Sequence, residues 1–264
     1  MADSAKSVSG SGLVAATEVA SEAAVRSSPN GLHYAPFADT GLDEAELGRM
    51  VQAVPASIAA ALSGKTYFFV PLAMAEGRSL EAAGHRSSDT TMISAAYTPE
   101  LAEQAICHRN VELATGEGVF ISSRLLTDRF SLAFEFFINV GHGFVNQAGI
   151  AEAFAELAWN QAVADVRGET SQDAWEARAT ALGRSEGAVR VDERAKGDFL
   201  EAAFSDSIAI YLLSLALDFD YSELREREYP LLAPQALADR LRLIAKLFPA
   251  NPDYEFAIRY RRRM

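Results

Sequence analysis

Apolar and polar positions divide the chain into a first half of short segments and a second half of long helices. Before residue 123 the apolar runs are short and rich in aromatic and β-branched residues, as in Thr66–Val70. After Gly149 the apolar residues recur at the spacing of amphipathic helices. This pattern predicts an α+β fold that is mostly α. A small mixed or antiparallel sheet in the first half would pack on a central buried helix, and the second half would be helical from about residue 150.

Turn residues and periodicity give the predicted boundaries of these elements. The TGEG stretch between two apolar segments is typical of a β-hairpin. In the first half we expect strands or docking segments at 32–37, 66–70, 90–97, 111–113 and 119–122, helices at 43–52 and 55–64, a loop at 75–89, and a short helix or strand-bearing connection at 99–107. In the second half we expect helices at 127–147, 150–166, 172–182, 199–217 and 234–248, with a charged, mobile segment at 187–196.

Residues 1–30 differ in composition from the rest of the chain. They are mainly Ser, Ala, Gly and Val, with few charges and little aromatic content. Such a composition buries too little surface to offset the entropy cost of ordering. We therefore expect residues 1–30 to be disordered and residues 31–264 to form a single domain.

The predicted helix at 127–147 carries one polar stripe. Glu135, Asn139, His142 and Asn146 fall within about 60° of arc on a helical wheel, and nearly every other position is apolar or glycine. A helix that is apolar almost all round is buried, so the stripe should face a cleft, a buried network or a ligand. Glycines on either side of His142 indicate a close approach to the backbone there.

Asp206 lies within the apolar run at 199–217. A buried carboxylate without a partner is costly, so Asp206 needs a hydroxyl, a histidine, an arginine or a metal. His142 on the other buried helix is the natural candidate, and we expect the two side chains to lie near each other. The pair could form a functional site or a purely structural buried network.

Charge and composition exclude several classes of function. The net charge is −12 and the pI about 4.8, which argues against nucleic-acid and anionic-membrane partners. A single cysteine, Cys107, rules out an internal disulfide and a cysteine-based zinc knuckle. Residues 1–30 lack a signal-peptide core. We expect a soluble, cytoplasmic protein.

The order of elements resembles that of zincin metallopeptidases, most closely the anthrax-lethal-factor type. A strand and a hairpin precede a helix bearing His142, in the frame INVGHGFVN where that family shows HEFGH, and a later helix bears Asp206. The resemblance covers about residues 50–215. It implies that His142 matches the second zinc-binding histidine and Asp206 the third ligand. It also implies that 119–122 is the edge strand along which such enzymes hold substrate peptides.

Two departures from that motif argue against catalysis. Ile138 stands where the first zinc ligand should be, and Asn139 stands where the general base should be. Glu135 cannot replace them, because it lies two helical turns from His142, about 10.5 Å along the axis. We therefore expect no zinc, no cofactor and no hydrolytic activity.

An inactivated peptidase fold can still hold a peptide. We expect a non-catalytic peptide-binding protein, similar to helper proteins that guide precursor peptides in ribosomal-peptide natural-product biosynthesis in bacteria. Two alternatives remain open: a metal-dependent hydrolase using Glu135, His142 and Asp206, and a structural protein that forms homo-oligomers. The predicted cleft consists of Glu135, Asn139, His142, Asn146, Asp206, Val119, Phe120, Ile121 and Ser122.

Overall fold

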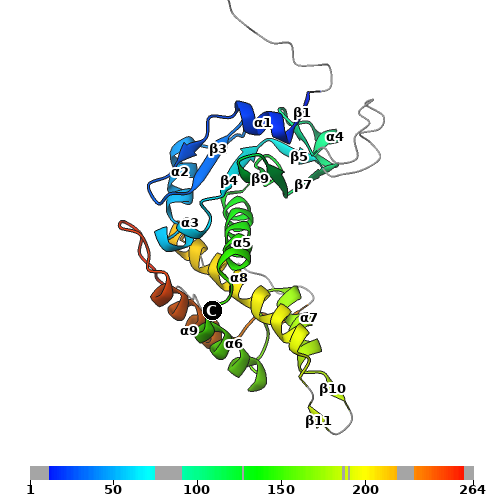
Figure 1. Cartoon of the computed structure of the whole chain (residues 1–264), viewed down its shortest axis with the longest axis vertical. Helices are drawn as coiled ribbons and strands as arrows, with labels where there is room; N and C mark the ends of the chain where they lie inside the picture. The colour runs from blue at the N-terminus through cyan, green and yellow to red at the C-terminus, as the bar shows by residue number, and fades with distance from the viewer. Residues whose placement is uncertain are drawn as a thin grey trace, which may run out of the picture. The chain divides into compact units, whose positions relative to one another are not determined.

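The chain is an α+β protein, as predicted, and it divides into two compact units (Figure 1). The computed structural model describes residues 12–74, 91–126, 128–185, 188–189, 191–218 and 229–258. The first unit comprises 1–51 and 63–135, and the second comprises 52–62 and 136–264. This division differs from the single domain expected for 31–264. The strands pair with one another within the first unit, and the long helices of the second pack on one another, so each unit has its own set of contacts.

A five-stranded mixed sheet forms the centre of the first unit, in the order β2-β3-β4-β9-β8. The three middle strands are parallel, and the strands at the two ends are antiparallel to their neighbours. A second, four-stranded antiparallel sheet has the order β1-β6-β5-β7. The bounds are β1 Leu13–Ala15, β2 Arg26–Ser27, β3 His33–Pro36, β4 Lys65–Val70, β5 Leu72–Met74, β6 Met92–Ser94, β7 Ala105–Ile106, β8 His108–Leu113 and β9 Gly116–Ser122.

Aromatic and β-branched residues explain why the middle strands form. The apolar runs of β4 and β9 are buried on both faces, as is typical of strands in the interior of a sheet. Phe68 and Phe120 lie directly opposite each other in the ladder, and their rings stack at 4.7 Å. A cluster of small apolar residues from the N-terminal segment packs against this pair.

The expectation of disorder in residues 1–30 is wrong for residues 12–30. They form β1, helix α1 (Ala16–Glu22) and β2, and β1 pairs with β6. Ala16 and Val19 lie three positions apart on α1 and are both buried. Small side chains at this spacing let a short helix approach the sheet closely, which composition alone does not reveal. Residues 1–11 lie outside the described part of the chain.

The short helices follow the predicted segments closely. Helix α2 is Glu44–Gln52, and α3, Ala56–Ala61, begins directly after Pro55. Thr98 caps α4, Pro99–Ala102, which leads into β7, so the predicted connection at 99–107 contains both a helix and a strand. The predicted loop at 75–89 lies outside the described residues.

The second unit is built around helix α8, Glu193–Ala216, which contacts α6, α7 and α9 (Figure 1). The bounds of its neighbours are α5 Arg129–Ala148, which begins in the first unit, α6 Glu152–Val163, α7 Gln172–Ala181 and α9 Pro234–Leu247. Asp192 accepts hydrogen bonds from the first turn of α8, so the helix begins earlier than predicted and includes part of the segment expected to be mobile. That segment also contains β11, Ala188–Val189, which pairs with β10, Arg184–Ser185.

Helix α8 is long and apolar enough to cross a membrane by length and composition. However, 72% of its apolar window is buried inside the protein. Its side chains pack against the neighbouring helices, including Phe204 against Phe154. The helix therefore has the burial of a core helix.

The close backbone approach predicted beside His142 occurs at Gly141. A Cβ atom at this position would lie 2.5 Å from the backbone oxygen of Ser205 on α8. Real Cβ atoms do not approach a backbone oxygen this closely, so glycine permits α5 and α8 to cross here. The partner at this crossing is another helix of the same unit.

We expect Gly141→Ala to lower the unfolding free energy of the second unit by about 1–3 kcal/mol, because the added methyl group must displace a backbone. Gly197→Ala is the matched control. Gly197 is exposed on α8 with nothing near its Cβ position, so alanine there should raise stability by about 0.5–1 kcal/mol. Urea denaturation of both variants gives the comparison, and equal effects would contradict the crossing as the reason for the glycine.

Candidate functional site

The predicted edge strand at 119–122 is not an edge. β9 lies between β4 and β8 and is paired on both sides. Val119, Phe120, Ile121 and Ser122 are at most 1% exposed, so none of them can line an open cleft. The segment is apolar because the strand lies inside the sheet and is buried on both faces, not because its edge is open to a partner.

Ser122 has a structural role at the junction of the two sheets. Its Oγ donates a hydrogen bond to the backbone oxygen of Ile106 at 2.5 Å and accepts one from the backbone N–H of Ala73 at 2.7 Å. These bonds connect β9 to β7 and β5. The hydroxyl is therefore used within the fold.

Within the described residues, β8 is the last strand at its end of the five-stranded sheet. The N–H of Ser122 donates to the oxygen of Cys107, and antiparallel strands bond at every second residue pair. The backbone N–H and C=O groups of Arg109, Val111 and Leu113 therefore point toward β9. Those of His108, Asn110 and Glu112 point away from the sheet.

Side chains of β8 alternate between two environments. His108, Asn110 and Glu112 are exposed on one face. Val111 and Leu113, on the other face, pack against the cluster that contains Phe120. Among the described residues, the strand thus combines an outward backbone edge with a polar face and a second face on which Val111 and Leu113 accompany Arg109.

Glu135, the first member of the polar stripe, lies beside this strand. His108 Nδ1 is 2.5 Å from Glu135 Oε1, and the two side chains are 41% and 18% exposed. The carboxylate fixes the orientation of the imidazole ring. Burial raises the pKa of the neighbouring Cys107 thiol, and the charge of Glu135 raises it further. The thiol is therefore protonated at neutral pH and poorly suited to act as a nucleophile.

Asp206 and His142 form a separate group in the second unit. Asp206 is 6% exposed and accepts a hydrogen bond from Thr170 Oγ1 at 2.9 Å. Burial raises its pKa to about 6, against hydrogen bonds from Ser171 and Thr170 and the charge of His142, which lower it. His142 thus lies close enough to influence Asp206, but Thr170 and Ser171 are the residues that satisfy its carboxyl group.

The polar stripe of α5 does not converge on one site. Asn139 is buried, whereas His142 and Asn146 are exposed. The stripe was expected to face a cleft, a buried network or a ligand; in the second half of α5 it faces solvent. The structure groups Glu135 with His108 and, separately, His142 with Asp206. Over the described residues, no three His, Cys, Asp or Glu side chains are placed to hold a metal ion.

Sequence reasoning missed a buried ionic network in the second unit. Arg240 Nη1 donates to Glu169 Oε2 at 2.9 Å, and Arg178 Nη1 donates to Glu169 Oε1 at 3.2 Å. The side chains of Glu169 and Arg240 are fully buried. Gln161 accepts from Arg240 Nε at 2.7 Å, and backbone oxygens accept from Arg178. Arg178 and Arg240 are charged residues on helices and look like part of a solvated face, and Glu169 lies in the connection between two helices, so the sequence pattern gave no signal. The network is satisfied internally and has a structural role.

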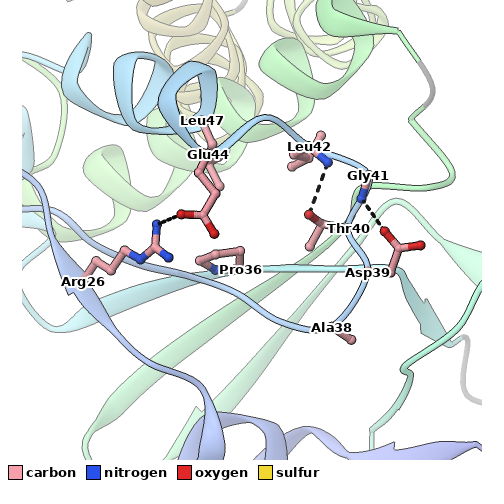
Figure 2. Close-up of a pocket in the computed structure, with 9 residues that line it drawn as sticks. All are labelled: Arg26, Pro36, Ala38, Asp39, Thr40, Gly41, Leu42, Glu44 and Leu47. Carbon is pink, nitrogen blue, oxygen red and sulfur yellow. Dashed lines mark hydrogen bonds and ion pairs between the residues drawn. The ribbon is translucent and has the colours of Figure 1, made fainter.

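A small polar hollow lies in the first unit beside the start of α2 (Figure 2). Its volume is about 290 Å³. Glu44 accepts from Arg26 at 2.9 Å within it. At its rim, Asp39 pairs with Arg124 at 2.7 Å. Both basic groups are therefore neutralised, and the lining gives no basis for assigning a ligand. The lining residues are Arg26, Pro36, Ala38, Asp39, Thr40, Gly41, Leu42, Glu44 and Leu47.

No protein-family model matches this chain, and no curated protein matches it significantly. A function must therefore be inferred from its own residues. The edge of β8, with the His108–Glu135 pair beside it, is the feature that best fits recognition of another molecule. The hydrogen bonds around Asp206 are made within the protein and indicate stability.

Proposed function

We propose that this protein is a non-catalytic peptide-binding protein on a degenerate zincin-like scaffold, with β8 as the strand that receives the peptide. A peptide in extended form would add to the sheet beside β8. The observation that carries this proposal is the row of outward backbone groups at His108, Asn110 and Glu112. Such groups pair readily with another extended chain.

The arrangement around β8 supports the zincin-like part of the proposal. β8 and β9 form a hairpin, and α5 is the next helix after β9. This is the order on which the resemblance to the lethal-factor type rests, with β8 in place of the strand first expected to hold the peptide. Glu135, near the start of α5, contacts β8 through His108.

The remaining features favour binding over hydrolysis. Ile138 and Asn139 replace a zinc ligand and the general base of the resembled motif, and neither can perform that role. Asp206 is enclosed by hydroxyl groups, and His142 is exposed. We propose a precursor peptide of a natural-product pathway as the physiological partner, by analogy with other inactivated hydrolases that hold peptides.

We expect Asn110→Pro to weaken peptide binding by roughly tenfold or more, because proline removes an outward N–H and its ring obstructs the edge. The probe is an immobilised library of random eight-residue peptides, followed by fluorescence anisotropy on the selected binders. Asn110→Ala is the control. It removes the same side chain and leaves the N–H in place, so its Kd should stay within about threefold of the parent, since most exposed substitutions have small effects.

Because the N–H of Asn110 points away from β9, proline at this position leaves the ladder to β9 intact. Circular dichroism should therefore show a folded variant. If no peptide in the library binds, or if folded Asn110→Pro binds like the parent, the strand-addition proposal is wrong.

A further inference from the structure

The polar face of β8 carries unbalanced negative charge. Glu112 lies directly opposite Glu117 of β9, so both carboxylates are on the same face of the sheet. Lys65 forms an ion pair with Glu117. In the described ranges, no basic side chain pairs with Glu112. Two carboxylates opposite each other repel, and one lysine compensates only one of them.

The second negative group on this face is Glu135. Its carboxylate lies 2.5 Å from His108 Nδ1. His108 and Glu112 lie four positions apart on β8, about 13 Å along a strand. The face therefore presents carboxylates beside both ends of the row of outward backbone groups.

The opposite face of β8 carries Arg109 together with the apolar residues Val111 and Leu113. Val111 and Leu113 are half-buried there and continue the core cluster to the edge of the sheet. A strand added beside β8 would place alternate side chains on the two faces. One set would meet the carboxylates, and the other would lie beside Arg109, Val111 and Leu113.

We propose that the bound peptide is cationic and amphipathic, with lysine or arginine at two positions four residues apart and apolar residues between them on the other face. This inference rests on the proposed function and specifies its ligand. In a peptide paired with β8, the residues directly opposite His108 and Glu112 share their face and lie within reach of the carboxylates. A peptide with acidic residues at those positions would be repelled.

Two capped six-residue peptides test the inference. Both have valine at positions 2, 4 and 6 and threonine at position 3; one has lysine at positions 1 and 5, and the other has glutamate there. We expect the lysine peptide to bind roughly tenfold more tightly at low salt, since two attractions replace two repulsions between exposed charges. The difference should shrink as ionic strength rises.

Glu112→Gln should reduce the preference for the lysine peptide by a factor of about three, because it removes one exposed charge pair, and such a pair has an effect of about this size. Glu103→Gln is the matched control, because Glu103 is exposed and lies outside β8, and it should leave the preference unchanged. Equal affinity of both peptides would overturn the inference and leave strand addition standing. Binding of neither peptide would contradict the inference and the proposed function together. If both variants lost the preference equally, the preference would come from the net charge of the protein, and its assignment to Glu112 would be wrong.

Discussion

Glu169→Ala should lower the unfolding free energy of the second unit by about 3–5 kcal/mol, because it leaves buried guanidinium groups without their carboxylate. Glu169 bonds to both Arg240 and Arg178, and the side chains of all three are at most 5% exposed. In the folded variant, Arg240 would keep its bond to Gln161 but lose both of its bonds to a carboxylate. Water cannot replace that partner without opening the core.

Tryptophan fluorescence during urea denaturation measures this effect directly. The chain has two tryptophans, Trp159 and Trp175, and both lie in the second unit, so the signal follows that unit. Glu176→Ala is the matched control, because Glu176 is exposed on α7 in the same unit and its loss should change stability by about 0.5 kcal/mol or less. A loss below about 1 kcal/mol for Glu169→Ala would show that the buried network contributes little.

Asp206→Asn should make the second unit more stable than the parent at neutral pH, by about 3 kcal/mol. Burial raises the pKa of Asp206 to about 6 in the folded state, from an ordinary value of 3.8. The folded state therefore retains a proton that the unfolded state has lost, and stability falls as pH rises from about 4 to about 6. A difference of about two pKa units corresponds to about 3 kcal/mol. Asparagine has no proton to lose and avoids this cost.

The difference in unfolding free energy between Asp206→Asn and the parent, measured from pH 4 to pH 7.5, isolates this group from all others that titrate. It should increase by about 3 kcal/mol in favour of the variant, mostly between pH 4 and 6. His142→Ala should raise the pH midpoint of this change slightly, because the charge of His142 lowers the pKa of Asp206, and the hydrogen bonds from Thr170 and Ser171 remain. A difference that does not vary with pH would show that Asp206 has an ordinary pKa.

Local patterns predicted most of the described elements because their signals are local. The apolar run before Pro71 forms β4, the TGEG turn forms a hairpin, and Pro234 begins α9. Helix starts were less exact where the capping residue lies in a charged segment, as at Asp192. Gly141 also gave a correct signal, because a glycine inside a helix is costly unless something approaches it.

Strand order and long-range polar contacts could not be predicted in the same way. The segment VFIS has no charge or proline, which fits an open edge as well as an interior strand; its pairing with β4 depends on residues far away in the sequence. Glu169 and Arg240 are separated by 71 positions, so nothing local indicates their contact. The partners of Asp206 were assigned to a conspicuous histidine, whereas two ordinary hydroxyl residues bind it.

Amide hydrogen exchange in β8, measured by NMR with and without a bound peptide, tests the central claim most directly. The account predicts that peptide slows exchange at His108, Asn110 and Glu112, roughly 100-fold when its concentration is 100 times Kd. The amides of Arg109 and Val111, which already point toward β9, should change little. Protection that appears elsewhere, with these three amides unchanged while peptide is bound, would contradict strand addition at β8.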